Sequence, residues 1–251
     1  MFFGFYFGPY AMFFLILMLV CGVFAASASA RVHSAYKTYG AVPTKSYMTG
    51  YDTAKRLLRA NGVKGISVGK VRGSLTDHYH PTKKIVNLSE SVYGDASVAS
   101  VAVAAHEIGH VMQKKKGYIP YKIRNFLVPI TNIGSRLALP LVLLGLILDV
   151  FVVATQNSDF GYYLALLGVA FYGLSTIFAL VTLPVEFDAS RRAKKMLVEE
   201  GVLTQEELPY AEKMLNAAAM TYVASLATSL VYFLRFAVWV LVLFGGNRRR
   251  R

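Results

Sequence analysis

The sequence contains a single cysteine, Cys21, which lies within a long apolar run. One cysteine has no partner in the chain for a disulfide bond and no companion thiols for a cysteine-rich metal cluster. Because structural zinc sites normally use four protein ligands rich in cysteine, this scarcity argues against a purely structural zinc site. The cysteine count carries no information about redox compartment.

Acidic residues are also few, with 14 Asp and Glu against 27 Lys and Arg, which gives a net charge of +13. Such an excess can indicate nucleic-acid binding. Residues 31–136 hold 17 of the positive residues and 5 acidic ones, but the positive residues are scattered among apolar positions rather than gathered in a basic helix. Cationic loops beside membrane spans explain this charge better, so we expect no nucleic-acid partner.

Hydrophobic residues, in contrast, make up 55% of the chain, which is more than a soluble domain needs. Four apolar stretches approach or exceed the roughly 20 residues that cross a bilayer. They cover residues 10–30, 137–153, 162–183 and 222–244. The sequence therefore predicts a mainly α, integral-membrane protein with about four transmembrane helices, placed in the cell membrane as a multi-pass protein in contact with the lipid bilayer.

The first and fourth stretches each leave an alternative open. An alternation of alanine and serine at residues 26–30 resembles a signal-peptide cleavage site, but residues 1–6 carry no Lys or Arg and the apolar run is long, so we favour an uncleaved anchor. Arg235 interrupts the fourth stretch, and a charge near mid-bilayer costs at least ~2.5 kcal/mol unless it is paired or snorkels. That stretch either spans the bilayer or lies along its interface.

These stretches divide the chain into five segments. They are an N-terminal anchor (1–30), a polar segment (31–136), a hairpin of spans joined by a polar turn at 155–161 (137–183), a second polar segment (184–221), and a membrane or interfacial helix with a basic tail (222–251). Because a hairpin returns the chain to the side that it left, both polar segments are expected on one face. Together they hold 22 of the 27 positive residues, which points that face toward the cytoplasm.

Local patterns in the first polar segment predict a small α+β subdomain. Thr49 and Asp52 are spaced like a capping box at a helix start, and Asn61 followed by glycine fits the end of that helix. Alternation around residues 66–68 and 84–88 is typical of strands.

The strongest chemical signal is His106-Glu107-Ile108-Gly109-His110, on a helix expected from about Asp95 to just before Gly117. Residues four apart share one face of a helix, so His106 and His110 can bring two imidazole nitrogens to one Zn²⁺. Glu107 can accept a proton from a zinc-activated water and pass it to the leaving amine. The run predicts a zinc-dependent peptidase.

A chance match on a buried or surface helix is the competing interpretation. Three features of the context argue against it. Apolar residues on both sides of the motif predict a dry wall around a metal site. Gly109 costs ~1 kcal/mol relative to alanine in a helix, which indicates that another backbone or a substrate packs closely there. The strand-like segment before the helix offers an edge on which an extended peptide can lie.

A catalytic zinc normally has three protein ligands, so one more is needed. The remaining histidines, at positions 33, 78 and 80, all precede the motif. After the hairpin come Glu186 and Asp188, and on spacing either carboxylate can complete the set. Glu186 also suits a structural role, because Pro184 fits the first turn of a new helix and an acidic residue stabilises a helix N-terminus.

Three segments together resemble the YugP-type neutral zinc metallopeptidases of bacterial membranes. They are AHEIGH at 105–110, LTDHYHP at 75–81 with LS at 88–89, and PVEFDAS at 184–190. The likeness extends over about residues 49–223. The chain is more distantly similar to the HtpX-type and CAAX prenyl endopeptidases, in which a membrane hairpin separates the two-histidine helix from a glutamate ligand. The resemblance implies a zincin-like, gluzincin-like subdomain, a Zn²⁺ cofactor, a protein or peptide substrate, and Glu186 as third ligand.

The sequence departs from that pattern at two places. In the distant relatives an aspartate usually stands four residues after the glutamate ligand, where this chain has Ser190. Asp188, two residues after the glutamate, is therefore our candidate for a hydrogen bond to a histidine ligand. The family often has aspartate where His80 stands, so His80 is not expected to be a ligand.

Two further residues are candidates on the substrate side of the site. His78 approaches zinc or substrate in one interpretation and is a surface-loop histidine in the one we favour. Tyr222 can donate a hydrogen bond to a tetrahedral oxyanion, although an interfacial aromatic is the commoner role for a tyrosine at a span boundary.

The function expected is a cytoplasm-facing, membrane-embedded zinc endopeptidase of membrane or membrane-proximal proteins. Residues 31–136 form its catalytic segment, and residues 184–221 supply the third ligand. The alternative is a non-catalytic membrane scaffold or accessory protein that retains a metal-binding fold. Transport has no support, because the spans lack paired ionisable residues at their centres apart from Arg235. Neither a cleavage preference nor an oligomeric state is encoded in the sequence.

Overall fold

The computed structural model describes residues 9–151 and 160–248. The chain forms two compact units. The sheet unit comprises Ala26–Lys122 and Leu183–Tyr222, and the described part of the span unit comprises residues 9–25, 123–151, 160–182 and 223–248. Four long helices contribute residues to both units: α2 (Pro9–Gly40), α6 (Ile119–Phe151), α8 (Phe160–Glu199) and α9 (Leu208–Arg248).

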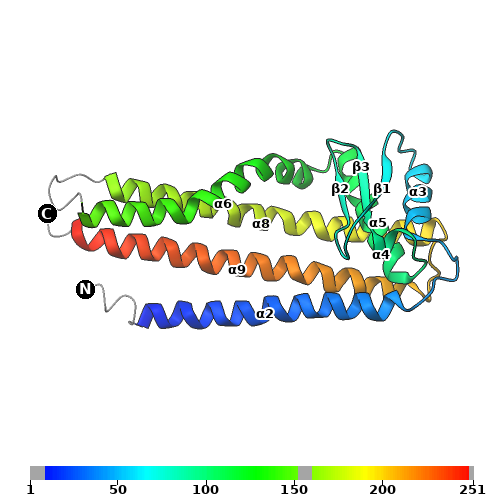
Figure 1. Cartoon of the computed structure of the whole chain (residues 1–251), viewed down its shortest axis with the longest axis horizontal. Helices are drawn as coiled ribbons and strands as arrows, with labels where there is room; N and C mark the ends of the chain where they lie inside the picture. Colours follow the sequence, from blue (N-terminus) through cyan, green and yellow to red (C-terminus); the bar gives the residue numbers. More distant parts are fainter. Residues whose placement is uncertain (1–8, 152–159, 249–251) are drawn as a thin grey trace. The chain divides into compact units, whose positions relative to one another are not determined.

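The sheet unit contains a small sheet with the strand order β1-β3-β2 (Figure 1). β1 (Ser67–Val71) runs parallel to β3 (Ile85–Ser89), so the strands expected around 66–68 and 84–88 are confirmed. β2 (His78–His80) pairs antiparallel with the other side of β3 and was not expected. Three residues are too few to show an alternating pattern, and this strand depends on its pairing with β3.

The first helix of the sheet unit is α3 (Gly50–Ala60), which begins after the predicted capping box. The Thr49 hydroxyl accepts a hydrogen bond from the Asp52 amide at 3.1 Å, and the Asp52 carboxylate accepts one from the Thr49 amide at 3.2 Å. Two backbone donors at the helix start are thereby satisfied. The helix ends at Asn61, as expected.

Helix α5 (Val98–Lys115) carries the two-histidine motif and begins three residues later than expected. Ser97 is its N-cap, and the Ser97 hydroxyl accepts a hydrogen bond from the Ser100 amide at 3.2 Å. Asp95 lies before the helix, where its carboxylate accepts hydrogen bonds from the hydroxyls of both serines. Gly117 ends the helix as predicted, in a left-handed conformation with φ of 67°.

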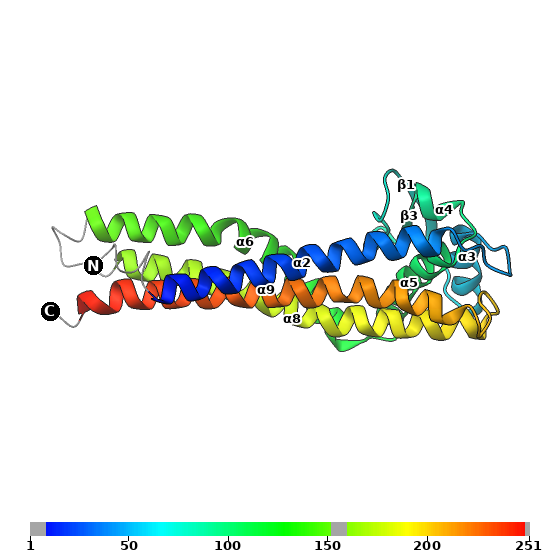
Figure 2. The same ribbon diagram turned by 90° about the horizontal axis from the view of Figure 1, so that it is seen from below.

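A buried apolar cluster surrounds α5 within the sheet unit. It draws residues from α3, β3, α4 (Glu90–Tyr93), the C-terminal part of α8 and the N-terminal part of α9. Figures 1 and 2 both show these parts of α8 and α9 side by side. Most residues of α5 are buried, as the apolar neighbours of the motif predicted. The core thus holds α5 against α8, the two helices that carry the candidate site.

In the span unit, α6 and α8 approach each other closely at glycines. A Cβ atom on Gly168 would lie 2.7 Å from the carbonyl oxygen of Ala138, and one on Gly145 would lie 2.5 Å from that of Gly161. Small residues allow such close packing between helices in a bilayer, where packing drives association.

Four helices of the described part of the chain are long and apolar enough to cross a membrane, which confirms the predicted number. These candidate spans are Tyr10–Gly40, Ile119–Gly145, Phe160–Glu199 and Leu208–Val242. The last one contains Arg235 and begins well before the apolar stretch 222–244. The alanine and serine run at 26–30 lies inside the first.

One boundary predicted near the site is wrong. Pro184 does not begin a new helix but lies within α8, which continues to Glu199. A proline removes one backbone hydrogen bond, and a long helix can tolerate that loss, particularly near a membrane span. Of the turn predicted at 155–161, residues 155–159 lie outside the described part, and the last two residues already belong to α8.

Candidate metal centre

Helices α5 and α8 bring three metal-ligating side chains together inside the sheet unit. The Nε2 atom of His106 lies 3.2 Å from Oε2 of Glu186, and Nε2 of His110 lies 3.6 Å from the same oxygen. One ligand atom from each of the three residues lies within 4.8 Å of the others. The side chains of Glu186, His110 and His106 are 2%, 9% and 15% exposed, so the cluster is largely buried and His106 is its most accessible member.

His110 is oriented by a buried glutamine. Its Nδ1 atom lies 3.0 Å from the side-chain oxygen of Gln113. Because an amide oxygen only accepts hydrogen bonds, Nδ1 of His110 is the donor, and the lone pair of Nε2 faces Glu186. Gln113 is itself fixed, since its amide nitrogen donates to the carbonyl of Val185 at 2.7 Å and to Asp188 at 3.0 Å.

His106 is held by a serine on α8. Its Nδ1 atom lies 3.1 Å from the hydroxyl oxygen of Ser190, which leaves Nε2 directed at Glu186. Asp188, our candidate for this kind of contact, lies against Gln113 and forms ion pairs with Arg191 and Arg192. Asp188 thus reaches a histidine only through Gln113, and Ser190 makes the direct contact.

The donor set fits Zn²⁺. Two neutral imidazole nitrogens and one carboxylate oxygen are the ligands of many catalytic zinc sites, which leave a further position for water or substrate. Both Nδ1 atoms point away from the centre toward hydrogen-bond partners, an arrangement that fixes the imidazoles for metal binding. The three residues therefore form a credible zinc site on geometry as well as chemistry.

Glu107 lies beside this cluster and is 7% exposed. The pKa of Glu107 is raised to about 7, chiefly by burial; the nearby carboxylates of Glu186 and Asp77 contribute to the rise, and His106 opposes it. The backbone amide of Tyr79 on β2 donates a hydrogen bond to the carboxylate. A carboxyl group with a pKa near neutrality is suited to taking up and releasing a proton.

A cavity of about 310 Å³ opens beside His106 and Glu107 within the sheet unit. Its walls come from α2, the segment before β2, α5 and α9, and they include Val32, His33, Asp77, Met214, Leu215 and Tyr222. Asp77 accepts hydrogen bonds from the amide and hydroxyl of Ser89, and burial raises its pKa. The cavity places an apolar wall next to the carboxyl of Glu107.

The structure places the other sequence candidates differently. Tyr222 lines the cavity with Glu107. His78 is exposed, lies on β2 rather than in a loop, and has its ring nitrogens 2.9 Å from the carbonyl of Thr76 and 3.1 Å from the Asn87 amide nitrogen. It is not part of the three-residue cluster formed by the described side chains.

Sequence reasoning missed Gln113, assigned no role to Ser190, and did not place His33 at the site. The sequence spacing could have indicated Gln113 and Ser190. Gln113 is three residues after His110, and Ser190 is four residues after Glu186, spacings that place side chains on one helix face. For His33 no such signal exists, because its place at the cavity depends on how α2 packs.

Comparison with known proteins agrees with this geometry. Residues 13–241 match a family described as "putative neutral zinc metallopeptidase". The chain belongs to this family. It is also 39% identical to a Bacillus subtilis protein described as "putative membrane protease YugP", over 90% of this chain and 96% of that protein. No solved structure matches. The resemblance predicted from the three sequence segments is thus confirmed at the level of the family.

Proposed function

We propose that this protein is a zinc-dependent endopeptidase that cleaves membrane or membrane-proximal proteins. The observation that carries this proposal is the convergence of His106, His110 and Glu186 next to Glu107, at the edge of a cavity. The family match supports zinc peptidase chemistry, and the four apolar helices support a substrate at or near the bilayer.

In this proposal His106, His110 and Glu186 hold the zinc ion. When bound, zinc lowers the pKa of water toward 7 and polarises the carbonyl of the peptide bond. Gln113 keeps His110 in the tautomer that presents the Nε2 lone pair to the ion, and Ser190 holds the ring of His106 with Nε2 directed at the ion. These contacts are made before substrate arrives, so little reorganisation is needed at the moment of reaction.

Glu107 acts as the base and then as the acid. Its carboxylate takes a proton from the attacking water, and the same group returns the proton to the nitrogen of the leaving amine. Burial favours both steps, because it brings the pKa of Glu107 close to the working pH. Tyr222, on the wall of the same cavity, donates a hydrogen bond to the carbonyl oxygen as negative charge develops on it.

We also infer that the catalytic segment 31–136 and the segment 184–221 face the cytoplasm. This inference rests on the 22 Lys and Arg residues that these two segments contain out of 27 in the chain. Positively charged residues beside spans are retained on the cytoplasmic side.

The proposal is tested by zinc content and peptide cleavage in the purified full-length protein. We expect one zinc per chain, and cleavage of a proteome-derived peptide library detected by mass spectrometry. Glu107→Gln retains the zinc and loses cleavage by several orders of magnitude, whereas Glu90→Gln, at an exposed acidic residue on α4, leaves both unchanged. Protein without stoichiometric zinc, or undiminished cleavage by Glu107→Gln, overturns the proposal.

A further inference from the structure

An arginine occupies one of the candidate spans, at a place that the zinc chemistry does not use. Arg235 lies on α9, seven residues before Val242, where the described part of the candidate span ends. At 1.5 Å per residue it is about 10 Å along the helix axis from that end. A charge at such a depth is unfavourable unless it is paired or hydrated, so an arginine within a span is rare and indicates a functional site.

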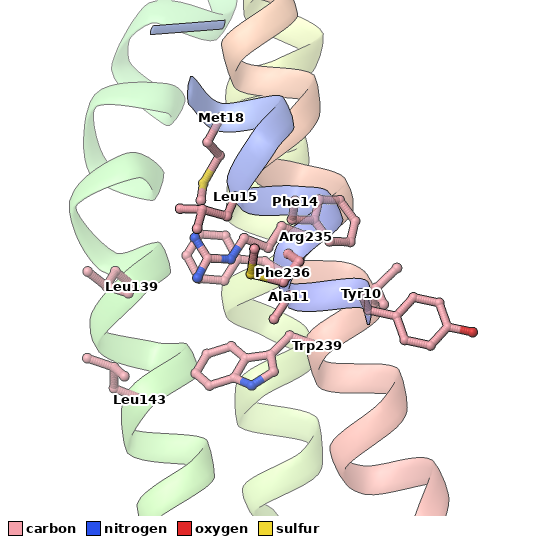
Figure 3. A pocket seen from close by; sticks show the side chains of 12 residues that line it. Tyr10, Ala11, Phe14, Leu15, Met18, Leu139, Leu143, Arg235, Phe236 and Trp239 are labelled. Atoms are coloured by element: carbon pink, nitrogen blue, oxygen red, sulfur yellow. The ribbon is translucent and has the colours of Figure 1, made fainter. Parts of the chain in front are cut away.

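The Arg235 side chain lines an apolar cavity of about 400 Å³ within the span unit. The cavity is formed by α2, α6 and α9, and Figure 3 shows the guanidinium between α2 and α6, near Met18, Leu139 and Phe236. None of the described residues that line this cavity is acidic. A surface that faces lipid is normally apolar, so an exposed cation within an apolar wall is unfavourable there.

Among the described residues, Arg235 makes one weak hydrogen bond inside the cavity. One guanidinium nitrogen lies 3.0 Å from the sulfur of Met18, and a thioether is a poor acceptor. The hydroxyl group of Tyr10, another lining residue, points away from the guanidinium (Figure 3). A guanidinium has five donors in a planar fork that matches a carboxylate, so the described residues leave most of its hydrogen-bonding capacity unused.

We propose that this cavity is a docking site for a transmembrane helix of another protein, which carries a carboxylate side chain at the depth of Arg235. The carboxylate satisfies the guanidinium, and the apolar wall that includes Leu139, Leu143 and Trp239 packs against the rest of the helix. Such a contact between helices is stabilised by apolar packing and by an ion pair, and the bilayer core holds no water that competes for the two charges.

The depth of Arg235 favours a helix over a lipid as the occupant. The charged group of an anionic lipid lies in the headgroup region, outside the hydrocarbon core. Arg235 is about 10 Å along the helix axis from Val242, where the described part of its span ends. A side chain on a partner helix can carry its carboxylate to any depth. A helix therefore supplies both a carboxylate at the level of Arg235 and an apolar surface for the cavity wall. The ligand chemistry is independent of zinc, and the site lies wholly within the span unit.

The test measures binding of a designed helix to the full-length protein in phosphatidylcholine nanodiscs. The probe is a synthetic single-span helix of Leu and Ala with one Glu about 10 Å from its end, and the matched probe has Gln there. By fluorescence energy transfer we expect the Glu probe to bind the wild type about 10-fold tighter, which corresponds to about 1.4 kcal/mol. The preference is expected to be the same after zinc is removed with a chelator.

Variants at position 235 separate charge pairing from a structural role. Arg235→Lys keeps the preference, Arg235→Leu loses it, and Arg235→Glu transfers it to a probe with Lys at the same depth. Arg136→Leu, on α6 outside the cavity lining, serves as the control and keeps the preference. A thermal unfolding midpoint for each variant shows that it is folded, and a gain of binding by the Lys probe cannot arise from misfolding.

Three results overturn the proposal. The first is equal binding of the Glu and Gln probes by the wild type. The second is a Glu preference that persists in Arg235→Leu. The third is complete displacement of the Glu probe by a few per cent of phosphatidylglycerol in the wild type, which would assign the cavity to an anionic lipid.

Discussion

The backbone carbonyl oxygen of Ala189 lies 2.5 Å from the position that a Cβ atom on Gly109 would occupy. Gly109 stands inside the two-histidine motif on α5, and Ala189 is three residues beyond Glu186 on α8. The two helix backbones therefore approach each other closely at the level of the metal centre. Without a side chain at position 109, the glutamate on α8 can reach both histidines on α5.

Replacement of Gly109 by alanine is expected to separate these helices. The extra methyl group has no space, and overpacking of this kind destabilises a protein by about 1–3 kcal/mol. Because the separation also moves Glu186 from the histidines, we expect zinc affinity to fall at least 10-fold. Thermal unfolding and a competition titration against a chromogenic chelator measure the two effects.

Gly94→Ala is the matched control for that experiment. No heavy atom outside its chain neighbours lies within 4 Å of a Cβ at this position, and its φ of −104° is open to any residue. We expect a change within about 0.5 kcal/mol. An equal loss of zinc affinity in both variants would contradict the role given to the contact between Gly109 and Ala189.

Gln113→Met is expected to weaken zinc binding without touching a metal ligand. Methionine fills a similar volume but releases Nδ1 of His110, and it leaves the Val185 carbonyl without its amide donor. Loss of such an orienting partner typically lowers metal affinity 10- to 100-fold. Chelator competition measures the affinity, and an unchanged dissociation constant for zinc would show that packing alone orients His110.

Local features of the fold were predictable because neighbouring residues determine them. The capping box at Thr49, the helix around His106 and His110, and the helix end at Gly117 all follow from short-range spacing. Gly109 was correctly interpreted as a point of close approach. The number of spans followed from the length of apolar runs.

The rest of the site depends on contacts between distant segments. Spacing left Glu186 and Asp188 as equal candidates for the third ligand, because the face that α8 turns to α5 is decided by packing at Ala189. The contact of Ser190 with His106 follows from the same packing. β2 exists only through its pairing with β3, so the hydrogen bond from Tyr79 to Glu107 had no signal in the sequence.

Zinc is expected to stabilise the folded protein through Glu186. A ligand that binds only the folded state at 100 times its dissociation constant adds about 2.7 kcal/mol to the free energy of unfolding. We expect Glu186→Gln to lose most of this gain, and His78→Ala to retain it because His78 lies outside the cluster. Thermal unfolding with and without zinc measures the stabilisation in both variants. Loss of the stabilisation in His78→Ala would show that His78 also binds the ion.

Tyr222→Phe separates a role in the reaction from a role at the membrane interface. If the hydroxyl donates to the developing oxyanion, its removal lowers kcat about 10²- to 10³-fold and changes KM little. Zinc content stays the same, because Tyr222 is not one of the clustered ligands. Steady-state cleavage of a fluorogenic peptide gives both constants. A decrease in kcat of less than about twofold would show that Tyr222 has no role in the reaction and is an interfacial aromatic.

The buried carboxyl of Glu107 is expected to make the metal-free protein less stable as the pH rises from 4.5 to 7. In the unfolded chain this group ionises near its ordinary pKa of 4.5, whereas in the folded protein burial raises the pKa to about 7. Between these values the folded state binds more protons, so the free energy of unfolding falls with increasing pH. The shift corresponds to a loss of about 3 kcal/mol, complete above pH 7.

Glu107→Gln removes this contribution, since glutamine does not titrate. In chelator-treated protein, the stability of the variant relative to the wild type should therefore increase from pH 4.5 to pH 7 and then level off. Titrating groups far from Glu107 affect both proteins equally, so the difference between their unfolding curves reports Glu107 together with its interactions with His106, Glu186 and Asp77. Parallel pH profiles for the two proteins would mean that water or a structural rearrangement already solvates the carboxylate in the folded state.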